Sequence, residues 1–431
     1  MFEERESIKV MEAVERVMQH CQYGKDERVH VSEADGRYLA EDIVADHPVP
    51  PFDRSPLDGF AIQSADTSQA SKDHPVTLEI VATVGAGHQF EGTLKEGQAV
   101  RVMTGTIIPP ACDAVVMFEL AHEYQENEND YITIKRPFKA GDFVSKQGEE
   151  TAKHEVVIKK GTRVTAGVVA VLATFGYEYV PVIKKPKIGI FATGTELLDI
   201  HEPLQPGKIR NSNAYMMISQ VQKAGGEALY FGKLMDEFDL CYDAISEALQ
   251  DVDALITTGG VSVGDFDFLP EIYNKLGAEV LFNKIAMRPG SVTTVAESGG
   301  KLLFGLSGNP SACFVGFELY ARPWIRTFLH SEKPYLQTVR GTLTVDFPKP
   351  NPFTRFIRSK VIYEGNRLYA EPIGMDKSQV VTSLAYSDCL VAVPGGSRGY
   401  KTGDEVDILL LEAEGSQIPF KDPLKRKDIA K

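Results

Sequence analysis

The sequence lacks the features by which membrane, secreted and disulfide-stabilised proteins are identified. No run approaches the ~18 consecutive apolar residues of a membrane-spanning helix, and residues 1–6 have no signal-peptide pattern. The five cysteines are odd in number and form no C-x-x-C pair, which disfavours a disulfide framework and a zinc site. We therefore expect a cytoplasmic protein whose cysteines are reduced.

An excess of positive charge is also absent. The chain has 46 Lys and Arg against 60 Asp and Glu, a formal net charge of −14. This balance argues against a nucleic-acid or anionic-membrane partner, so an anionic ligand needs a locally cationic site. The length of 431 residues predicts several domains, and 43% hydrophobic residues are enough for ordinary cores.

The most informative stretch contains neither of the two common phosphate-binding motifs. Residues 253–258 are a short apolar run typical of a buried parallel strand, and a glycine-rich turn follows at 258–264. It matches neither G-x-G-x-x-G nor G-x-x-x-x-G-K-[ST]. Glycines here permit positive φ and let backbone amides converge on an anion, while Thr258 and Ser262 add hydroxyl donors. The alternative is an ordinary strand-to-helix turn of a doubly wound sheet.

Two carboxylates, Asp265 and Asp267, follow this turn directly. Carboxylates beside an anion cradle would repel the ligand unless a cation lies between them, so we interpret the pair as candidate Mg²⁺ ligands.

Two further strand-to-turn units flank this one in sequence. A strand over 187–191 leads into a glycine and hydroxyl turn at 192–197, which carries Glu196. A third strand begins at 302 and ends in a turn where Asn309 suits an N-cap and Pro310 the first helical position. In a doubly wound sheet the carboxyl ends of the strands share one ligand crevice, so we expect the three turns to converge.

The regions around this α/β segment are rich in predicted strands. Short β-prone runs occupy 75–135, and an all-β pattern follows Arg322-Pro323. In that later region we predict a strand over 343–347 and a hairpin at Gly365-Asn366.

Seven short motifs carry a resemblance over nearly the whole chain, and they occur in order. They are residues 52–61, 101–105, 148–150, 192–197, 258–264, 288–290 and 306–310. In these motifs the chain resembles the molybdopterin molybdenumtransferase family, which includes MoeA and the gephyrin E domain. The resemblance implies insertion of molybdate into adenylylated molybdopterin, with Mg²⁺ as cofactor, molybdate as substrate and AMP released.

The resemblance also implies partners. It predicts a homodimer in which the sheet domain of one subunit faces the small β-rich domain of the other. Further expected partners are adenylylated molybdopterin, an adenylyltransferase and molybdoenzyme acceptors, with no nucleic acid and no membrane.

The site residues implied by the resemblance fall into four groups. Asp58, Thr104 and Glu150 come from the partner subunit and join Glu196 and Asp267 in the catalytic set. Glu196 and Asp267 also hold Mg²⁺. The nucleotide and phosphates lie on Gly259, Gly260, Ser262 and Gly264, and further substrate-binding residues are Thr193, Gly194 and Asn309. Molybdate takes a pocket of Arg288, Ser307, Arg358 and Ser378.

The predicted fold is multidomain, α/β plus β. It has a central doubly wound α/β sheet domain, a β-rich inserted domain, an elongated helical and linker domain and a C-terminal β-barrel-like domain. The predicted boundaries are 1–26 and 142–180 for the linker and dimerisation domain, with an extended segment at 43–52; 27–42 and 53–141 for the small β-rich domain; 181–329 for the molybdopterin-binding α/β domain; 330–420 for the C-terminal β domain; and 421–431 for a basic tail.

One departure and two alternatives qualify this interpretation. The family often has Lys-Pro-Gly-Lys-Pro where this chain has residues 288–292, so Ser291 replaces an expected cation. Molybdopterin adenylyltransferases share the sheet domain, but the flanking β domains and the Asp58 segment argue against that activity. A non-catalytic dimeric scaffold of the same fold is the second alternative, although a scaffold would not require the candidate metal carboxylates.

Overall fold

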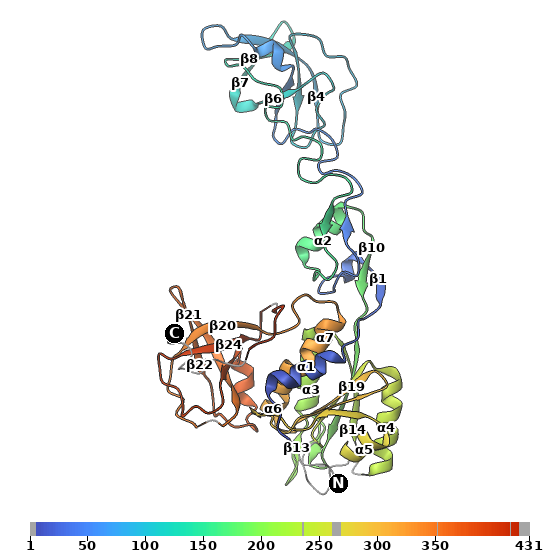
Figure 1. The fold of residues 1–431 in the computed structure, drawn as a ribbon. Coiled ribbons are helices and arrows are strands. Elements are labelled where there is room, and N and C mark those ends of the chain that lie inside the picture. The colour runs from blue at the N-terminus through green and yellow to red at the C-terminus, as the bar shows by residue number, and fades with distance from the viewer. Residues whose placement is uncertain (1–5, 235–236, 261–268, 351, 414, 422–431) are drawn as a thin grey trace. The chain divides into compact units, whose positions relative to one another are not determined.

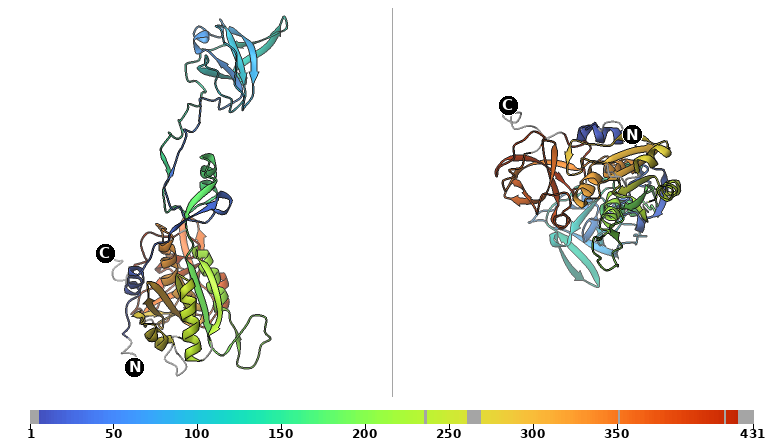
Figure 2. Two further views of the ribbon diagram at one scale, coloured as in Figure 1. Left: turned by 90° about the vertical axis from the view of Figure 1, so that its right-hand side faces the viewer. Right: turned by 90° about the horizontal axis from the view of Figure 1, so that it is seen from below.

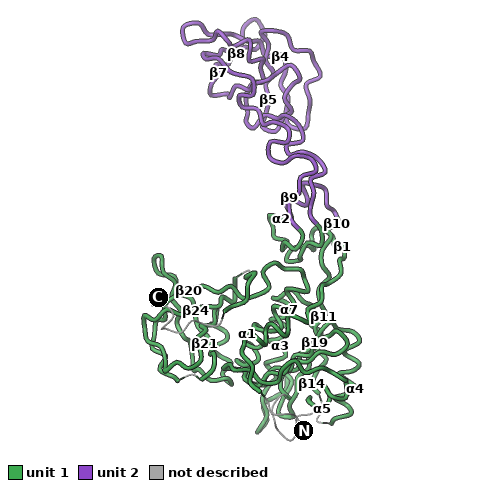
Figure 3. Tube along the Cα trace, in the orientation of Figure 1, with its two compact units in different colours: residues 1–41, 160–169, 179–431 green, residues 42–159, 170–178 purple. Residues whose placement is uncertain are grey.

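The computed structural model describes residues 6–234, 237–260, 269–350, 352–413 and 415–421. The chain divides into two compact units (Figure 3). The larger unit comprises Met1–Glu41, Lys160–Val169 and Tyr179–Lys431, and the smaller unit comprises Asp42–Lys159 and Ala170–Glu178. Helix α2 (Ala166–Thr174) contains one of the points at which the chain passes between them. Among the described residues, none of the helices combines the length and apolarity needed to cross a membrane.

A six-stranded sheet in the order β14-β11-β15-β19-β18-β16 forms the centre of the larger unit. Strands β14, β11, β15 and β19 run parallel, and β18 is antiparallel to both of its neighbours. The three central strands read as continuous apolar runs because both faces of the sheet are covered. The strand bounds are β11 Lys187–Thr193, β14 Glu227–Leu234, β15 Ala254–Thr258, β16 Glu279–Phe282, β18 Thr294–Ser298 and β19 Lys301–Leu306.

Helices cover the two faces of this sheet (Figure 1). Ile190, Ile256 and Phe304 point to one face, where they join the core formed with α1 (Val10–Gln19), α3 (Asn213–Ala224), α6 (Pro310–Gly316), the π-helix η4 (Phe317–Ala321) and α7 (Arg322–Phe328). The alternate residues, including Leu255 and Leu303, pack on the other face under α4 (Phe238–Asp251) and α5 (Leu269–Lys275). The predicted α/β sheet with helices on both sides is confirmed, as the second orientation also shows (Figure 2).

The C-terminal strands form a closed barrel in the order β21-β22-β20-β24-β23, because β23 also pairs with β21. Strand β17 (Met287–Arg288) adds to it alongside β21. The barrel bounds are β20 Gln337–Leu343, β21 Thr354–Glu364, β22 Arg367–Pro372, β23 Cys389–Val393 and β24 Glu405–Leu410. Closure leaves no long exposed sheet edge among these described strands.

The two strand predictions for this region have different outcomes. The Gly365-Asn366 hairpin is confirmed, because Glu364 pairs with Arg367 across the turn and Gly365 has φ +58°. The strand predicted over 343–347 is wrong in position: β20 ends at Leu343, and Phe347 makes only an isolated bridge with Tyr400. Residues 337–343 include Gly341 and polar side chains, so their local pattern is weak, yet antiparallel pairing with β24 makes them a strand.

The smaller unit contains a second six-stranded sheet, in the order β6-β3-β5-β4-β8-β7. Its strands are β3 Gly59–Ile62, β4 Val76–Val84, β5 Gln98–Val102, β6 Ala114–Met117, β7 Ala121–Glu126 and β8 Asn129–Ile134. A separate short pair, β2 (Ile43–Val44) with β9 (Val156–Ile158), lies where the chain enters and leaves this unit. Residues 59–134 thus form the predicted β-rich domain.

One predicted domain boundary differs from the structure. Residues 27–42 are assigned by their sequence pattern to the small β-rich domain, but β1 (Asp26–His30) pairs with β10 (Tyr179–Ile183), and both lie in the larger unit. The alternating exposure of β1 identifies a strand without revealing a partner so far along the chain.

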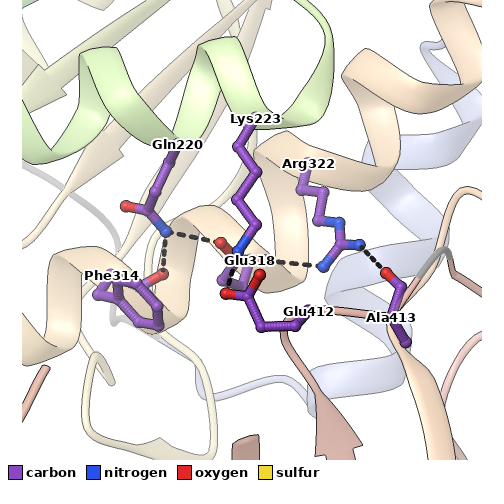
Figure 4. A network of polar contacts seen from close by, with 7 residues as sticks. All are labelled: Gln220, Lys223, Phe314, Glu318, Arg322, Glu412 and Ala413. Atoms are coloured by element: carbon purple, nitrogen blue, oxygen red, sulfur yellow. Dashed lines mark hydrogen bonds and ion pairs between the residues drawn. The ribbon is translucent and has the colours of Figure 1, made fainter. Parts of the chain in front are cut away.

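A buried polar network helps to hold the larger unit together (Figure 4). The carboxylate of Glu318 accepts hydrogen bonds from the Arg322 guanidinium at 3.1 Å and from the Gln220 amide at 2.8 Å. Arg322 also donates to the Ala413 carbonyl at 3.5 Å, beyond the end of the last barrel strand. Glu318 and Arg322 are only 7% and 4% exposed, so each charge depends on its partner.

We therefore expect Arg322→Met to lower the free energy of unfolding by about 3–5 kcal/mol, because it leaves the buried Glu318 carboxylate without its cation. Urea unfolding followed by the fluorescence of Trp324, the single tryptophan, measures this in the larger unit. The double variant Glu318→Leu with Arg322→Met removes both charges and should recover most of the loss. Equal losses in the single and double variants would contradict the importance of the pair.

Candidate functional site

Three turns meet at the carboxyl edge of the α/β sheet, as the sequence predicts. They follow the neighbouring parallel strands β11, β15 and β19. The amide of Gly259 donates to the Leu306 carbonyl at 2.8 Å, and the Thr193 hydroxyl donates to the Thr258 carbonyl at 3.3 Å. The convergence is therefore confirmed by hydrogen bonds between the turns.

Glycine is required at the centre of this meeting point. Gly259 and Gly260 have φ values of +105° and +67°, which side chains with a Cβ rarely adopt. A Cβ on Gly259 would lie 2.5 Å from the Thr193 hydroxyl oxygen, and one on Gly308 would lie 3.7 Å from the Gly259 Cα. The turn backbones are thus packed closely against one another at a place where side chains would force them apart.

Asn213, which the predicted site omits, and Thr258, a predicted hydroxyl donor, both have polar atoms here. Asn213, at the start of α3, donates its amide to the Gly308 carbonyl at 2.8 Å, while its buried Oδ1 atom has no hydrogen-bond partner. Among the described residues, the buried hydroxyl of Thr258 likewise has no partner. In the sequence Asn213 stands where a helix begins. That position alone accounts for an asparagine, so no sequence signal indicated a role in ligand binding.

The candidate metal residues are only partly described. Glu196 is exposed, and its carboxylate lies over Gly194, where both oxygens would clash with a Cβ. Ser262, Gly264 and Asp267 lie outside the described residues. Within the described part of the chain, no three His, Cys, Asp or Glu side chains gather into a metal-binding group. A single exposed carboxylate suits Mg²⁺, which commonly keeps several waters and binds one or two carboxylates together with substrate phosphates.

A cationic cleft of about 370 Å³ is lined by residues of β17 and the turn after it, by β21 and by residues 376–379. Three of the four predicted molybdate residues, Arg288, Arg358 and Ser378, line it together. The remaining lining residues are Pro289, Gly290, Ser291, Arg355, Asp376, Lys377 and Gln379. The cationic residues Arg355 and Lys377 were not among the predicted site residues.

The two buried arginines of the cleft are held by the protein itself. Arg358 donates to the Ser383 hydroxyl and the Met375 carbonyl, both at 2.8 Å, and burial lowers the pKa of its guanidinium. An arginine nevertheless stays charged. Arg355 donates to the Asp376 carboxylate at 2.5 Å, and its Nε atom has no partner. Arg288 is exposed, so its side chain is available to a ligand.

Ser307 and Asn309 lie on the turn after β19 and are not among the residues that line the cleft. The Ser307 hydroxyl accepts from the Asn309 amide at 3.2 Å. Asn309 is the N-cap of α6 and Pro310 begins the helix, as predicted, although the Asn309 side chain makes no capping bond.

The smaller unit brings Asp58 and Thr104 together. The Asp58 carboxylate accepts from the Thr104 amide at 2.7 Å and from its hydroxyl at 2.9 Å. These two bonds lower the pKa of Asp58, although the side chain is exposed to solvent. Glu150 is exposed, and its backbone amide donates to the Val49 carbonyl at 3.0 Å. No hydrogen bond between described atoms joins it to Asp58 or Thr104.

Comparison with known proteins agrees with this architecture. Family models match three consecutive regions: the MoeA N-terminal region (domain I and II) at 8–176, a probable molybdopterin binding domain at 189–327, and the MoeA C-terminal region (domain IV) at 340–411. The molybdopterin molybdenumtransferase of Bacillus subtilis (strain 168) is 55% identical over 421 residues, covering 97% of this chain and 98% of that protein. The chain belongs to the molybdopterin molybdenumtransferase family.

Other members of the molybdopterin molybdenumtransferase family give the same result. The enzyme of that name from Staphylococcus aureus (strain MRSA252) is 46% identical over 417 residues, covering 97% of this chain and 99% of its own. The crystal structure of the molybdopterin biosynthesis MoeA protein from Pyrococcus horikoshii OT3 superposes with a TM-score of 0.79 at 31% identity, covering 94% of this chain and 100% of the other. The resemblance identified from the seven motifs is therefore confirmed.

The lowered pKa of Asp58 predicts a pH-dependent stability. Because its folded pKa lies below the ordinary value of about 4, the stabilisation from its ionised form is complete above that value. It is lost as the pH falls through the folded pKa. The difference in urea midpoint between the wild type and Asp58→Ala, followed by circular dichroism, should be constant above about pH 5 and narrow below pH 4. Thr104→Val retains the amide donor, so its urea midpoint should fall between those of the wild type and Asp58→Ala. A difference in midpoint that does not change with pH would contradict the lowered pKa of Asp58.

Proposed function

We propose that this protein is a molybdopterin molybdenumtransferase, which inserts molybdate into adenylylated molybdopterin and releases AMP during molybdenum cofactor biosynthesis. The observation that carries the proposal is the pairing, within one unit, of a glycine edge, where the turns after β11, β15 and β19 meet, with a cationic cleft suited to a small oxyanion. Family membership over nearly the full length supports it.

The glycine edge would hold the phosphoanhydride of adenylylated molybdopterin. Gly259, Gly260 and Gly194 have positive φ, which would let their backbone amides converge on an anion, and Thr193 adds a hydroxyl. Ser262, Gly264 and Asn309 complete the proposed set on sequence grounds. The unpartnered Asn213 Oδ1 and Thr258 hydroxyl are further candidates for hydrogen bonds to the pterin or the nucleotide, because buried polar atoms normally have partners.

The cleft would hold molybdate. Arg288 offers an exposed guanidinium, and the Arg358 guanidinium and the Ser378 residue define the adjoining wall. Arginine suits a tetrahedral oxyanion because its charge is permanent and its donors are arranged as a fork. Lys377 and Ser291 both line the cleft, so Lys377 would supply a cation where the family's second lysine is replaced. Ser307 remains a proposed contact from the adjoining turn.

Glu196 and Asp267 would hold Mg²⁺, which neutralises phosphate charge when it is bound. Asp58, Thr104 and Glu150 would act from the partner subunit of a homodimer. In this role the Asp58 carboxylate, which Thr104 keeps ionised to low pH, would accept a hydrogen bond. A sedimentation mass equal to one 47.4 kDa chain would contradict the dimer.

We further propose a cytoplasmic location, an adenylyltransferase that supplies the substrate, and molybdoenzymes that accept the product. The five cysteines are free thiols, four of them buried, which is consistent with a reducing compartment.

The proposed activity is tested with the purified protein, adenylylated molybdopterin, molybdate and Mg²⁺. We expect AMP release that requires molybdate and Mg²⁺ and yields a cofactor able to activate a molybdoenzyme. ATP consumption on bare molybdopterin would instead identify an adenylyltransferase. Tight binding of adenylylated molybdopterin without turnover would favour a scaffold.

Arg288→Gln should raise the KM for molybdate by about tenfold to a hundredfold, because it removes a charged donor from the cleft. Arg288 is exposed, so the thermal midpoint should change little. Arg340→Gln is the matched control: it removes the same charge from an exposed barrel position that pairs with Glu405 and Asp407 and does not line the cleft. Equal effects of the two substitutions would show that Arg288 acts only through general charge.

A further inference from the structure

One wall of the cationic cleft is an irregular segment, residues 376–380, which we call the cleft segment. It contributes Asp376, Lys377, Ser378 and Gln379 to the lining. From the barrel side it is held by Arg355, which binds the Asp376 carboxylate, and by Arg358, which donates to the Lys377 carbonyl at 3.3 Å. These contacts fix its first half.

The second half of the cleft segment is held from the other side by Ser311. The Ser311 hydroxyl donates to the Val380 carbonyl at 2.6 Å, and its backbone amide donates to the Ser378 carbonyl at 3.0 Å. Ser311 is fully buried and does not line the cleft. It therefore cannot contact a bound anion directly, and any influence on the anion passes through the cleft segment.

The first turn of α6 also contacts the opposite wall. A Cβ on Gly290 would lie 3.4 Å from the carbonyl oxygen of Ala312, the residue after Ser311. Gly290 belongs to the wall that carries Arg288. Two consecutive residues of one helical turn thus touch both walls, and the spacing between the walls depends on this turn.

We propose that Ser311 is a positioning residue for the oxyanion in the cleft: its hydroxyl and amide hold the cleft segment at the distance from Arg288 that a small oxyanion needs. The inference rests on the proposed function, in which that oxyanion is molybdate. Without the hydroxyl, the carbonyl of Val380 loses its donor, and the segment moves toward other partners or water. The hydrogen bond from the Ser311 backbone amide to the Ser378 carbonyl remains, so the cleft segment loosens rather than unfolds.

The experiment compares wild type and Ser311→Ala by equilibrium dialysis against molybdate alone, followed by steady-state assay. Loss of one hydrogen bond should raise the molybdate Kd and KM about three- to tenfold. The kcat at saturating molybdate should be unchanged, because the reacting groups are intact. A residue that acted only in core packing would change the thermal midpoint without this separation of KM from kcat.

Two further variants isolate the hydroxyl. Ser311→Thr retains the donor and should restore the wild-type Kd, whereas Ser311→Gly, which lacks it, should resemble Ser311→Ala. Ser246→Ala is the matched control, since it removes a buried hydroxyl that has no hydrogen-bond partner from α4, on the other face of the sheet. If Ser311→Thr binds as weakly as Ser311→Ala, the hydroxyl is not responsible and the proposal is overturned.

A second measurement keeps the proposal testable if the alanine variant is poorly folded. Hydrogen exchange of the wild-type protein should slow in peptides covering 375–383 when molybdate is added, and Ser311→Gly should show a smaller decrease. Wild-type binding with no difference among the Ser311 variants overturns the positioning role but leaves the proposed function intact. If the wild type does not bind molybdate, the assignment of the cleft itself fails.

Discussion

At the carboxyl edge of the α/β sheet, the backbone of Gly259 approaches Thr193 so closely that no Cβ fits at its position, and Gly308 lies in ordinary contact with the Gly259 Cα. This close approach depends on three parallel strands ending at the same level, held by the bond from the Gly259 amide to Leu306. Everything proposed for phosphate binding requires that geometry. The turn after β19 continues directly into α6, whose residue Ser311 bonds the segment that lines the cationic cleft.

The residues that line the cleft carry a net positive charge, opposite in sign to the net charge of the chain. The chain carries −14, yet the residues lining the cleft include three arginines and one lysine against the single carboxylate of Asp376. Asp376 is bound to Arg355 and Lys349, so it orders the arginine more than it repels a ligand. The net negative charge of the chain disfavours nonspecific polyanions, while the local cations retain a small oxyanion.

Features that depend on neighbouring residues or on parallel strand order could be predicted from the sequence. Glycine placement after three apolar strands indicated a shared crevice, and Gly365-Asn366 indicated a hairpin. Arg355 and Lys377 could not be found this way, because their role arises from barrel closure and from an irregular segment. The pairing of β1 with β10 was hidden for a related reason: nearly the whole smaller unit separates the two strands in sequence. Glu150 and Asp267 remain predictions.

The pairing of β1 with β10 and the packing of α1 affect how the chain can fold during its synthesis. The sheet of the smaller unit is contained in residues 59–134, so all its strands leave the ribosome together. Helix α1 instead packs against β16, η4 and α7, and Arg16 donates to the Leu281 carbonyl at 2.6 Å. Its apolar face, including Val10, Val14 and Val17, therefore has no native partner until most of the chain has been made. The first segment to emerge is among the last to be buried, and during that interval it depends on chaperones or on speed of translation to avoid aggregation.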